Sequence, residues 1–462
     1  MKKNAEIVVD SGSRALTINE IIDRRPLSPF QVRTIVLCGI VLVLEGFDAQ
    51  CIGFLAPSIS ETLHIPLRTF GPIFAAGLVG LMIAAMAIGP VADRWGRKWP
   101  LVASTLTFAV FSLLTARVTS FNELLILRFL TGLGLGGAMP NVVALTSEYA
   151  PKRLQSVLVA MLFCGIPLGA LVSGLASSVM IPTWGWRSVF YLGGILPLAV
   201  SLALVTALPE SVRFLSVRGA NPLKIVAIMA RISPELASAS LNLSISRDPG
   251  SKGMPVSQLF TEGRATGTIL LWVPFFMNLL IIYFIVNWLP GLLRQSGMPV
   301  SAGIAAVSLF SLGGIVGALA EGRLINGFGA YTVLLAEFGV SALLIGALAY
   351  AASSYLLAMA VTFVLGVSVQ GAQAGINAAS ASFYPTSMRA TGVGWALGVG
   401  RIGSIIGPVF GGVLLSMEWT PQQILLSGTA PALCATVAVL ASNLLQTNAS
   451  AYHSEPNPGR AR

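Results

Sequence analysis

Residues 34–56 read TIVLCGIVLVLEGFDAQCIGFLA, a hydrophobic run that is long enough to cross a lipid bilayer as a helix. The run contains two acids, Glu45 and Asp48, although a charge at the bilayer centre costs about 3 kcal/mol on insertion scales. Acids at such a position normally face a cavity and mark the pathway of an ion or a substrate. The run therefore predicts a membrane helix with a functional polar site inside it.

The whole chain has the composition of an integral membrane protein. Of its 462 residues 55% are hydrophobic and only 10% are charged, whereas soluble domains carry about 25% charged residues. No stretch alternates with the period of two that barrel strands need, so we expect an all-α membrane fold. Twelve apolar stretches are long enough to span, near residues 34–56, 70–92, 99–118, 123–147, 155–180, 186–208, 266–289, 301–325, 331–353, 355–381, 390–416 and 421–445.

The distribution of lysine and arginine predicts the orientation. Segments on the side of the N-terminus contain 21 of the 28 Lys and Arg residues, and the opposite loops contain only Arg68, Arg117, Arg187 and Arg294. We therefore expect both termini to lie in the cytoplasm. The net charge of +10 is then a topology signal, and no nucleic-acid partner is expected.

One long polar segment separates the sixth span from the seventh and divides the chain into two halves of six helices. The predicted parts are a cytoplasmic N-terminal arm, a first half, a cytoplasmic central loop, a second half and a cytoplasmic tail. Their boundaries are 1–33, 34–208, 209–265, 266–445 and 446–462.

The two halves are related in sequence within their fourth spans. Phe129, Gly132, Gly137, Ala138 and Pro151 recur 234 positions later, as Phe363, Gly366, Gly371, Ala372 and Pro385. Parallel six-helix repeats are typical of one large class of transporters, whose binding site lies near the midplane between the repeats.

Three motifs resemble those of the major facilitator superfamily. They are GPVADRWGRK at 89–98, similar to its signature loop, RFLTGLGLGGAMP at 128–140, similar to its fourth-helix motif, and LPESVRFL at 208–215, similar to its exit from helix six. EGFDAQCIGFLAPSI at 45–59 and YPTSMRATGVGWALGVGRIGSIIGP at 384–408 resemble the aromatic acid:proton symporter family, in particular its 4-hydroxybenzoate and protocatechuate branch. The likeness covers nearly the whole chain.

This resemblance implies a secondary transporter of a bacterial inner membrane that imports small aromatic carboxylates with protons by alternating access. It also implies a multi-pass protein in the lipid bilayer that works as a monomer, without cofactor or metal. Two features depart from the family pattern. The first acid is Glu45 where many members have Asp, and the second-half counterpart of the signature loop, INGFGAY at 325–331, lacks its acid and its arginines.

The intramembrane charges fall at matching depths. With a rise of about 1.5 Å per residue, Asp48 and Arg128 lie at similar heights, and Arg401 lies level with Glu45. A carboxylate can bind and release a proton, whereas an arginine stays charged. We therefore predict that Asp48 and Glu45, which share a helix face, couple to protons. Arg401 and Arg128 are the predicted holders of the substrate carboxylate.

Amide and aromatic side chains complete the predicted substrate site. Amides are costly to leave without a partner in lipid, and aromatic rings suit an aromatic ligand. The candidates are Asn141, Gln370, Gln373, Asn377, Trp395, Phe276 and Tyr283. Glu321, Arg323 and Glu337 lie nearer the ends of their spans and are interpreted as interface charges. Trp184, Trp186, Trp288 and Trp419 are interpreted as an aromatic belt.

The signature loop suggests a gate. In the superfamily its acid, here Asp93, lies at the cytoplasmic start of helix eleven, where an anion complements a helix N-terminus. The other candidates for a charge network that closes the cytoplasmic side are Arg94, Arg97, Glu148 and Arg389.

Other functions stay open at this point. A symporter of another small organic anion, such as a dicarboxylate, a drug antiporter and a non-transporting aromatic-acid chemoreceptor are the alternatives. The segment CGIPLGALVSG at 164–174 lacks the usual antiporter pattern. An enzyme is not expected, because no histidine falls in any span.

Overall fold

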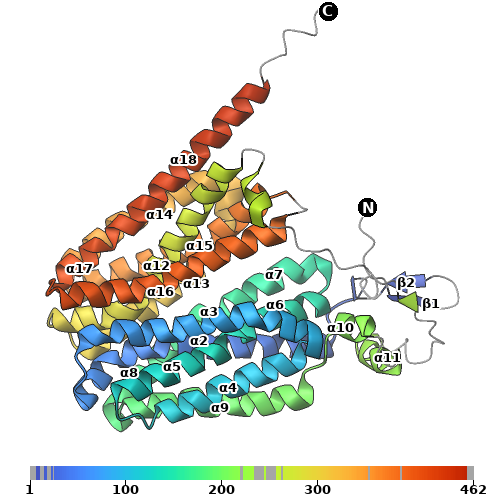
Figure 1. Ribbon diagram of the computed structural model, residues 1–462, viewed down its shortest axis with the longest axis horizontal. Coiled ribbons are helices and arrows are strands. Elements are labelled where there is room, and N and C mark those ends of the chain that lie inside the picture. Colours follow the sequence, from blue (N-terminus) through green and yellow to red (C-terminus); the bar gives the residue numbers. More distant parts are fainter. Residues whose placement is uncertain are drawn as a thin grey trace, which may run out of the picture. The chain divides into compact units, whose positions relative to one another are not determined.

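The computed structural model describes residues 7–10, 15–17, 22–23, 25–218, 222–233, 244–245, 256–261, 264–351, 354–385 and 388–454. Among these residues, 12 helical segments are long and apolar enough to cross a membrane (Figure 1). Each of them overlaps one of the twelve predicted spans. The prediction of a helical membrane protein with twelve spans is therefore confirmed.

The chain forms two compact units. Unit 1 comprises Met1–Cys51, Ala76–Ser173 and Met180–Lys252, and unit 2 comprises Ile52–Ala75, Gly174–Val179 and Gly253–Arg462. Three helices contribute residues to both units, namely α2 (Pro29–Leu63), α3 (Phe70–Trp95) and α8 (Gly165–Trp184). Unit 1 also contains α4 (Lys98–Thr115), α5 (Phe121–Gly136), α6 (Ala138–Tyr149), α7 (Lys152–Phe163), α9 (Trp186–Ala207), α10 (Val212–Val217) and α11 (Pro222–Ala230).

Unit 2 is built around one long helix, α12 (Ala265–Gln295), which packs against most of the others. The others are α13 (Val300–Phe328), α14 (Ala330–Ala351), α15 (Tyr355–Phe383), α16 (Arg389–Ser416), α17 (Pro421–Ser427) and α18 (Thr429–Ser454). Two 3₁₀ turns, η1 (Leu67–Thr69) and η3 (Val256–Phe260), complete the unit.

Unit 1 also contains a small sheet that the sequence did not predict. The antiparallel strands β1 (Ile7–Asp10), β2 (Ala15–Thr17) and β3 (Ser244–Ile245) have the order β2-β1-β3. Part of the N-terminal arm therefore pairs with part of the central loop. The sheet adds to the helical fold without changing its class.

Three predicted spans are each divided into two helices, and proline explains the breaks. The span at 123–147 breaks between α5 and α6 at Gly137, the span at 155–180 breaks between α7 and α8 at Cys164, and the span at 421–445 breaks between α17 and α18 at Gly428. Proline has no N–H to donate four residues back, so Pro140 leaves the carbonyl of Gly136 without its helical bond. In the same way Pro167 leaves the carbonyl of Phe163 without one, and Pro431 leaves that of Ser427 without one.

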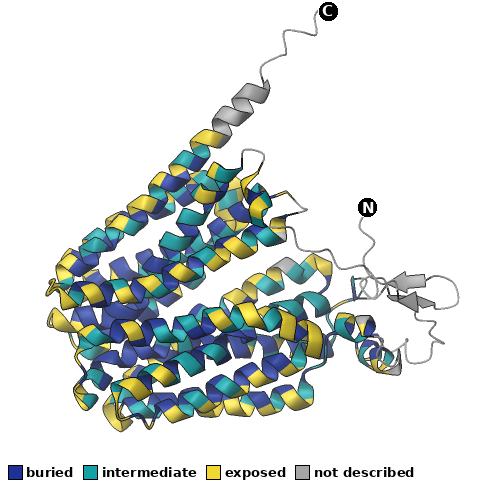
Figure 2. Cartoon of the chain, in the orientation of Figure 1, coloured by how far each residue is buried: buried dark blue, intermediate teal, exposed yellow. Residues whose placement is uncertain are grey.

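Many large apolar side chains are exposed on the membrane helices, as lipid contact requires. Figure 2 shows exposed residues alternating with buried ones along α9. Leu202 in that helix is 68% exposed, and its neighbour Ser201 is buried. Two tryptophans depart from the predicted aromatic belt, since Trp186 is 3% exposed and Trp288 is fully buried. Nε1 of Trp288 donates to the carbonyl of Pro408 at 2.8 Å. Its indole N–H has a partner there, which permits burial.

Helix packing explains why glycine recurs in the internal repeat. A Cβ on Gly132 would lie 2.0 Å from the carbonyl oxygen of Gly77, and a Cβ on Gly366 would lie 2.0 Å from that of Phe310. In each unit the repeated glycine therefore lets the fourth span touch the backbone of the second span of its half, as small residues do in membrane interfaces.

Gly366→Ala is therefore expected to destabilise the protein. The methyl group meets backbone that cannot rotate away, so α15 and α13 must separate, at a cost of about 1–3 kcal/mol or more. Gly398→Ala is the matched control, because nothing lies within 4 Å of a Cβ there. Thermal unfolding of the purified protein in detergent should show a lowered midpoint for Gly366→Ala alone. Equal midpoints would contradict this packing.

Candidate functional site

The two predicted proton acids are buried in α2. Glu45 is 3% exposed and Asp48 is fully buried. Gly46 lies between them and presses against α8, since a Cβ on it would lie 2.2 Å from the carbonyl oxygen of Ile166. The helix contact through Gly46 therefore fixes the rotation of α2 about its axis, and with it the direction in which both acids point.

Asp48 forms a buried ion pair with Arg128 of α5. Nη1 of Arg128 donates to Oδ2 of Asp48 at 3.1 Å, and Nη2 donates to the backbone carbonyl of the same residue at 3.2 Å. Arg128 itself is 3% exposed. The equal depths estimated from the sequence therefore correspond to a direct contact in the structure.

This ion pair is incompletely satisfied. Oδ1 of Asp48 and Nε of Arg128 are buried and have no hydrogen-bond partner among the described residues. Gly77 of α3 leaves room beside the guanidinium, because a Cβ there would lie 3.7 Å from Nη2. A buried ion pair with spare donors and acceptors is expensive for stability alone, which is the pattern expected of a functional site.

Asn141 of α6 is the other buried polar candidate of unit 1. It is fully buried, and its Nδ2 donates to the carbonyl of Gly137 at 2.8 Å. Gly137 is the junction between α5 and α6, so the side chain of Asn141 stabilises the break in that span. Its Oδ1 has no hydrogen-bond partner in the part of the chain that the structure describes.

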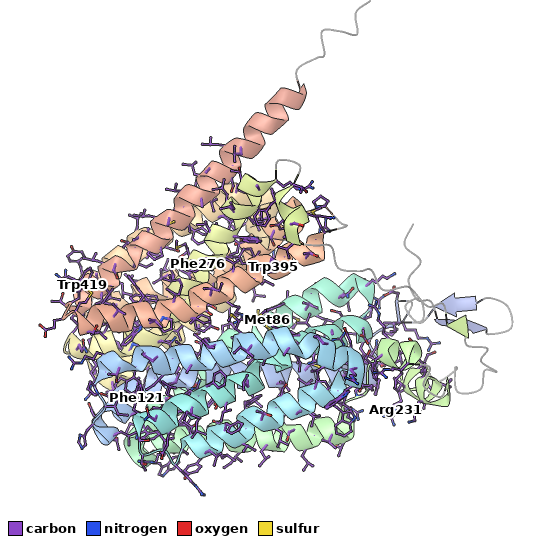
Figure 3. The ribbon with its side chains drawn as sticks, in the orientation of Figure 1. Met86, Phe121, Arg231, Phe276, Trp395 and Trp419 are labelled. Atoms are coloured by element: carbon purple, nitrogen blue, oxygen red, sulfur yellow. The ribbon has the colours of Figure 1, made fainter. Side chains whose placement is uncertain are left out.

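In unit 2 an aromatic group lies between α12 and α16. The rings of Trp272 and Trp395 stack, with centroids 6.3 Å apart and planes at 16°. Nε1 of Trp272 donates to the hydroxyl of Tyr384 at 3.2 Å. Figure 3 labels Trp395 on α16 and Phe276 on α12, which is the neighbouring helix. Trp395 is 47% exposed, so one side of its ring is open.

A set of amides lies on the face of α12 that meets α15. Nδ2 of Asn278 donates to Oε1 of Gln373 at 3.0 Å and to the carbonyl of Val369 at 3.1 Å. Oδ1 of Asn278 and Oδ1 of Asn377 are buried acceptors with no hydrogen-bond partner within the described ranges. Asn278 belongs with the predicted amides, because an amide in a membrane span is costly to leave without a partner.

Arg401 of α16 lies level with these residues. A Cβ on Gly400 would lie 3.2 Å from the carbonyl oxygen of Phe275, and one on Gly403 would lie 2.1 Å from that of Phe276. Arg401 lies between these two close contacts and is half-buried. The structure therefore places Arg401, Phe276 and Asn278 at one level of unit 2.

Two other candidates have different surroundings. Nε2 of Gln370 donates to the carbonyl of Phe310 at 3.2 Å, so Gln370 points towards α13. Tyr283 lies five positions beyond Asn278 on α12 and is half-buried, and its carbonyl accepts from Asn287.

The signature loop contains an ion pair and a helix cap. Nη2 of Arg97 donates to Oδ1 of Asp93 at 3.1 Å. Oε1 of Glu210 accepts from the backbone N–H groups of Arg97 at 2.7 Å and Lys98 at 3.1 Å, where α4 begins. Gly96 has φ +92°, and a Cβ there would strike the carboxylate of Glu210. Glu210 was missed as a network residue, although it lies in the quoted motif LPESVRFL.

The remaining gating candidates lie at helix ends. The hydroxyl of Ser211 donates to Oε2 of Glu148, and both Arg97 and Arg213 interact with that carboxylate. The carbonyl of Arg94 accepts from the guanidinium of Arg218. Arg389 is exposed at the first turn of α16. The network in unit 1 therefore joins the signature loop to the exit of the sixth span.

Comparison with known sequences agrees with this arrangement. The family model described as Major Facilitator Superfamily matches residues 38–408 and 305–459. The 4-hydroxybenzoate transporter PcaK of Pseudomonas putida is 40% identical, over 94% of this chain and 98% of the relative. The gallate transporter of Pseudomonas putida is 38% identical, over 96% and 98%. The benzoate transport protein of Acinetobacter baylyi is 32% identical, over 93% of each chain.

A solved structure has the same fold. A bacterial homologue of the human lysosomal transporter Spinster, in an inward-facing and unoccupied conformation, matches with a TM-score of 0.65 and 16% identity. The match covers 90% of this chain and 95% of that one.

Proposed function

Because the chain belongs to the major facilitator superfamily, we propose that it imports small aromatic carboxylates with protons by alternating access. It is a multi-pass membrane protein and a transporter rather than an enzyme. The relatives are named for 4-hydroxybenzoate, gallate and benzoate, which share an aromatic ring with one carboxylate. We place the protein in the inner membrane of a bacterium, as a monomer with both termini in the cytoplasm, and the lysine and arginine bias supports this orientation.

The observation that carries the proposal is the buried ion pair of Asp48 and Arg128. In the empty carrier Asp48 neutralises Arg128. When a substrate carboxylate compensates the guanidinium instead, Asp48 takes up a proton, because an unpaired buried carboxylate is costly. Substrate binding and proton binding are thereby linked, and Glu45, one turn away on the same face, relays the proton.

The polar and aromatic groups of unit 2 also match the chemistry of such a substrate. Arg401 is the second predicted holder of the carboxylate beside Arg128, since guanidinium and carboxylate pair through two parallel hydrogen bonds. The rings of Trp272, Trp395 and Phe276 suit the aromatic ring. The acceptor oxygens of Asn278 and Asn377 match ring hydroxyl groups, which are donors.

Transport assays test the proposal directly. Proteoliposomes with the purified protein should take up labelled 4-hydroxybenzoate, and unlabelled benzoate, protocatechuate or gallate should compete. Dicarboxylates such as succinate should not compete. Binding without uptake of any of these acids would indicate a chemoreceptor, and competition by dicarboxylates alone would indicate a different anion transporter. Either result would contradict the proposal.

Arg401→Lys is expected to weaken substrate binding by about tenfold or more. Lysine keeps the charge but loses the planar fork, and a hydrogen bond to a charged group contributes about 1.5–3 kcal/mol. Arg117→Lys, in an exposed loop, is the matched control. The dissociation constant for 4-hydroxybenzoate should rise in Arg401→Lys and stay unchanged in Arg117→Lys. An unchanged constant in both Arg401→Lys and Arg401→Ala would move the carboxylate site elsewhere.

A further inference from the structure

Unit 2 contains a second pair of acids that the proposed mechanism does not use. Glu321 of α13 is 2% exposed, which contradicts its interpretation as an interface charge. Glu337 of α14 is half-buried. Each lies seven residues from the short connection between the two helices, which corresponds to about 10 Å of helix. Both acids therefore lie within the membrane segments.

The two carboxyl groups meet above the backbone of α15. A Cβ on Gly371 would lie 2.5 Å from Oε1 of Glu337 and 3.6 Å from Oε2 of Glu321. A Cβ on Gly375, one turn further on, would lie 2.3 Å from Oε1 of Glu321. A side chain at Gly371 or Gly375 would occupy the space of the two carboxyl groups. Both positions therefore need glycine for the two acids to lie here.

If both acids were ionised, neither could donate a hydrogen bond to the other. Both side-chain oxygens of Glu321 and Oε2 of Glu337 have no hydrogen-bond partner among the described residues. Carboxylates only accept hydrogen bonds, so a bond between the two groups forms only when one of them carries a proton. Two adjacent carboxylates without a cation tend to share one proton for this reason.

No cation on the packed helices replaces that proton. The helices against α13 and α14 are α8, α12, α15, α17 and α18. In the sequence of these seven helices the cations are Arg323, which is exposed two positions from Glu321, and Arg294, which pairs with Glu61. Tyr452 and His453 follow the candidate membrane span of α18, which ends at Leu445. The other titratable groups on these helices are Tyr283, Tyr331, Tyr350, Tyr355 and Cys434.

A purely structural tie between these helices would not need acids. One turn beyond Glu337 on α14, the hydroxyl of Ser341 donates to the hydroxyl of Ser368 on α15 at 2.9 Å. That neutral bond joins the same helices without placing charge in the membrane. Burying two acids one helical turn away costs more free energy than burying two hydroxyl groups. A structural contact between the helices therefore does not explain the acids.

We propose that Glu321 and Glu337 share a proton and form a second proton site of the transport cycle, apart from Asp48. The shared proton comes from water on one side of the membrane and is released to water on the other, with no change in covalent bonds. The inference rests on the proposed function. It extends that function by raising the number of protons from one to two for each substrate.

Glu337→Gln separates this role from a structural one. The amide of glutamine still donates to Glu321, so a structural bond is preserved, but no proton can be released. In proteoliposomes with a gradient of one pH unit and no membrane potential, each coupled proton supports about tenfold accumulation. Accumulation of labelled 4-hydroxybenzoate should therefore fall about tenfold in Glu337→Gln, and Glu418→Gln, an exposed loop acid, should match the wild type.

Two further measurements make the result decisive. Exchange of labelled for unlabelled substrate needs no net proton movement, so its rate in Glu337→Gln should stay within about twofold of the wild type. Infrared spectra at neutral pH should show a protonated carboxyl band that is lost in both Glu337→Gln and Glu321→Gln. Equal accumulation in Glu337→Gln and wild type, an unchanged infrared band, or sodium-dependent uptake that Glu337→Gln removes would each overturn the inference.

The proposed function can fail separately. If the wild-type protein exchanges no aromatic carboxylate, the substrate proposal is wrong, and the infrared band still tests whether the two acids share a proton. If exchange occurs but accumulation in Glu337→Gln is unchanged, only the second proton site is wrong.

Discussion

Asp48→Asn is expected to abolish net uptake while substrate exchange continues. Asparagine keeps an oxygen for Nη1 of Arg128 but has no charge, so the guanidinium of the empty carrier is left uncompensated. The empty carrier then cannot return through the membrane, because an unpaired charge there is too costly. A substrate carboxylate restores the balance, and exchange of one substrate molecule for another therefore persists.

Two transport modes in the same proteoliposomes measure this effect. Uptake driven by a pH gradient should fall at least 100-fold in Asp48→Asn, while exchange stays within about tenfold of wild type. Glu418→Gln should change neither mode. Gradient-driven uptake that survives in both Asp48→Asn and Glu45→Gln would remove these acids from the proton pathway.

The same pair has a predicted effect on stability. Removing one member of a buried ion pair costs about 3–5 kcal/mol, because the other charge stays buried without its partner. Neutralising both members removes that penalty. The double variant Asp48→Asn/Arg128→Gln should therefore unfold at a higher temperature than either single variant, yet remain inactive in net uptake. Additive losses of stability would mean that the two residues do not compensate each other.

Much of the membrane fold was predictable because the bilayer imposes a length and a polarity on each span. Helix rise alone placed Asp48 and Arg128 at one depth, and the structure joins them at 3.1 Å. The breaks at Gly137 and Cys164 were also implicit in Pro140 and Pro167, since proline removes one helical bond. The predicted spans at 123–147 and 155–180 were nevertheless continuous, so both of these breaks were missed.

Other features depend on which helices pack together, which hydropathy does not reveal. Trp288 lies near the end of its predicted span, where tryptophan usually indicates the membrane interface. It is buried instead, because a carbonyl on α16 accepts its N–H. Glu321 and Glu337 lie near the ends of their spans, where interface charges are common. Only the contact of α13, α14 and α15 shows that the two acids face each other over Gly371 and Gly375.

The repeat illustrates the same limit. Gly137 and Gly371 are equivalent positions, and a Cβ on either would strike a polar side chain, Ser104 in unit 1 and Glu337 in unit 2. The sequence showed that the two glycines correspond. It did not show that a neutral hydroxyl in one half is matched by a carboxyl in the other, because that depends on the partner helix.

Uptake driven by the membrane potential alone is the second large effect that we expect. A benzoate-type substrate has one carboxylate, so import with a single proton moves no net charge and the potential has no influence. With two protons, one from Asp48 and one from the pair of Glu321 and Glu337, one positive charge enters with each substrate. That charge gains about 2.3 kcal/mol per 100 mV, which supports about 50-fold accumulation.

A potassium diffusion potential of about 100 mV, inside negative and without a pH gradient, should therefore drive uptake of labelled 4-hydroxybenzoate towards that limit. Glu337→Gln should lose this response, because the remaining proton only balances the substrate charge, and it should still accumulate substrate in a pH gradient. Indifference of the wild-type protein to the potential, together with uptake in a pH gradient, would establish one proton per substrate. In that case Asp48, with Glu45 as its relay, carries the single coupled proton, and the buried pair in unit 2 keeps its proton throughout the cycle.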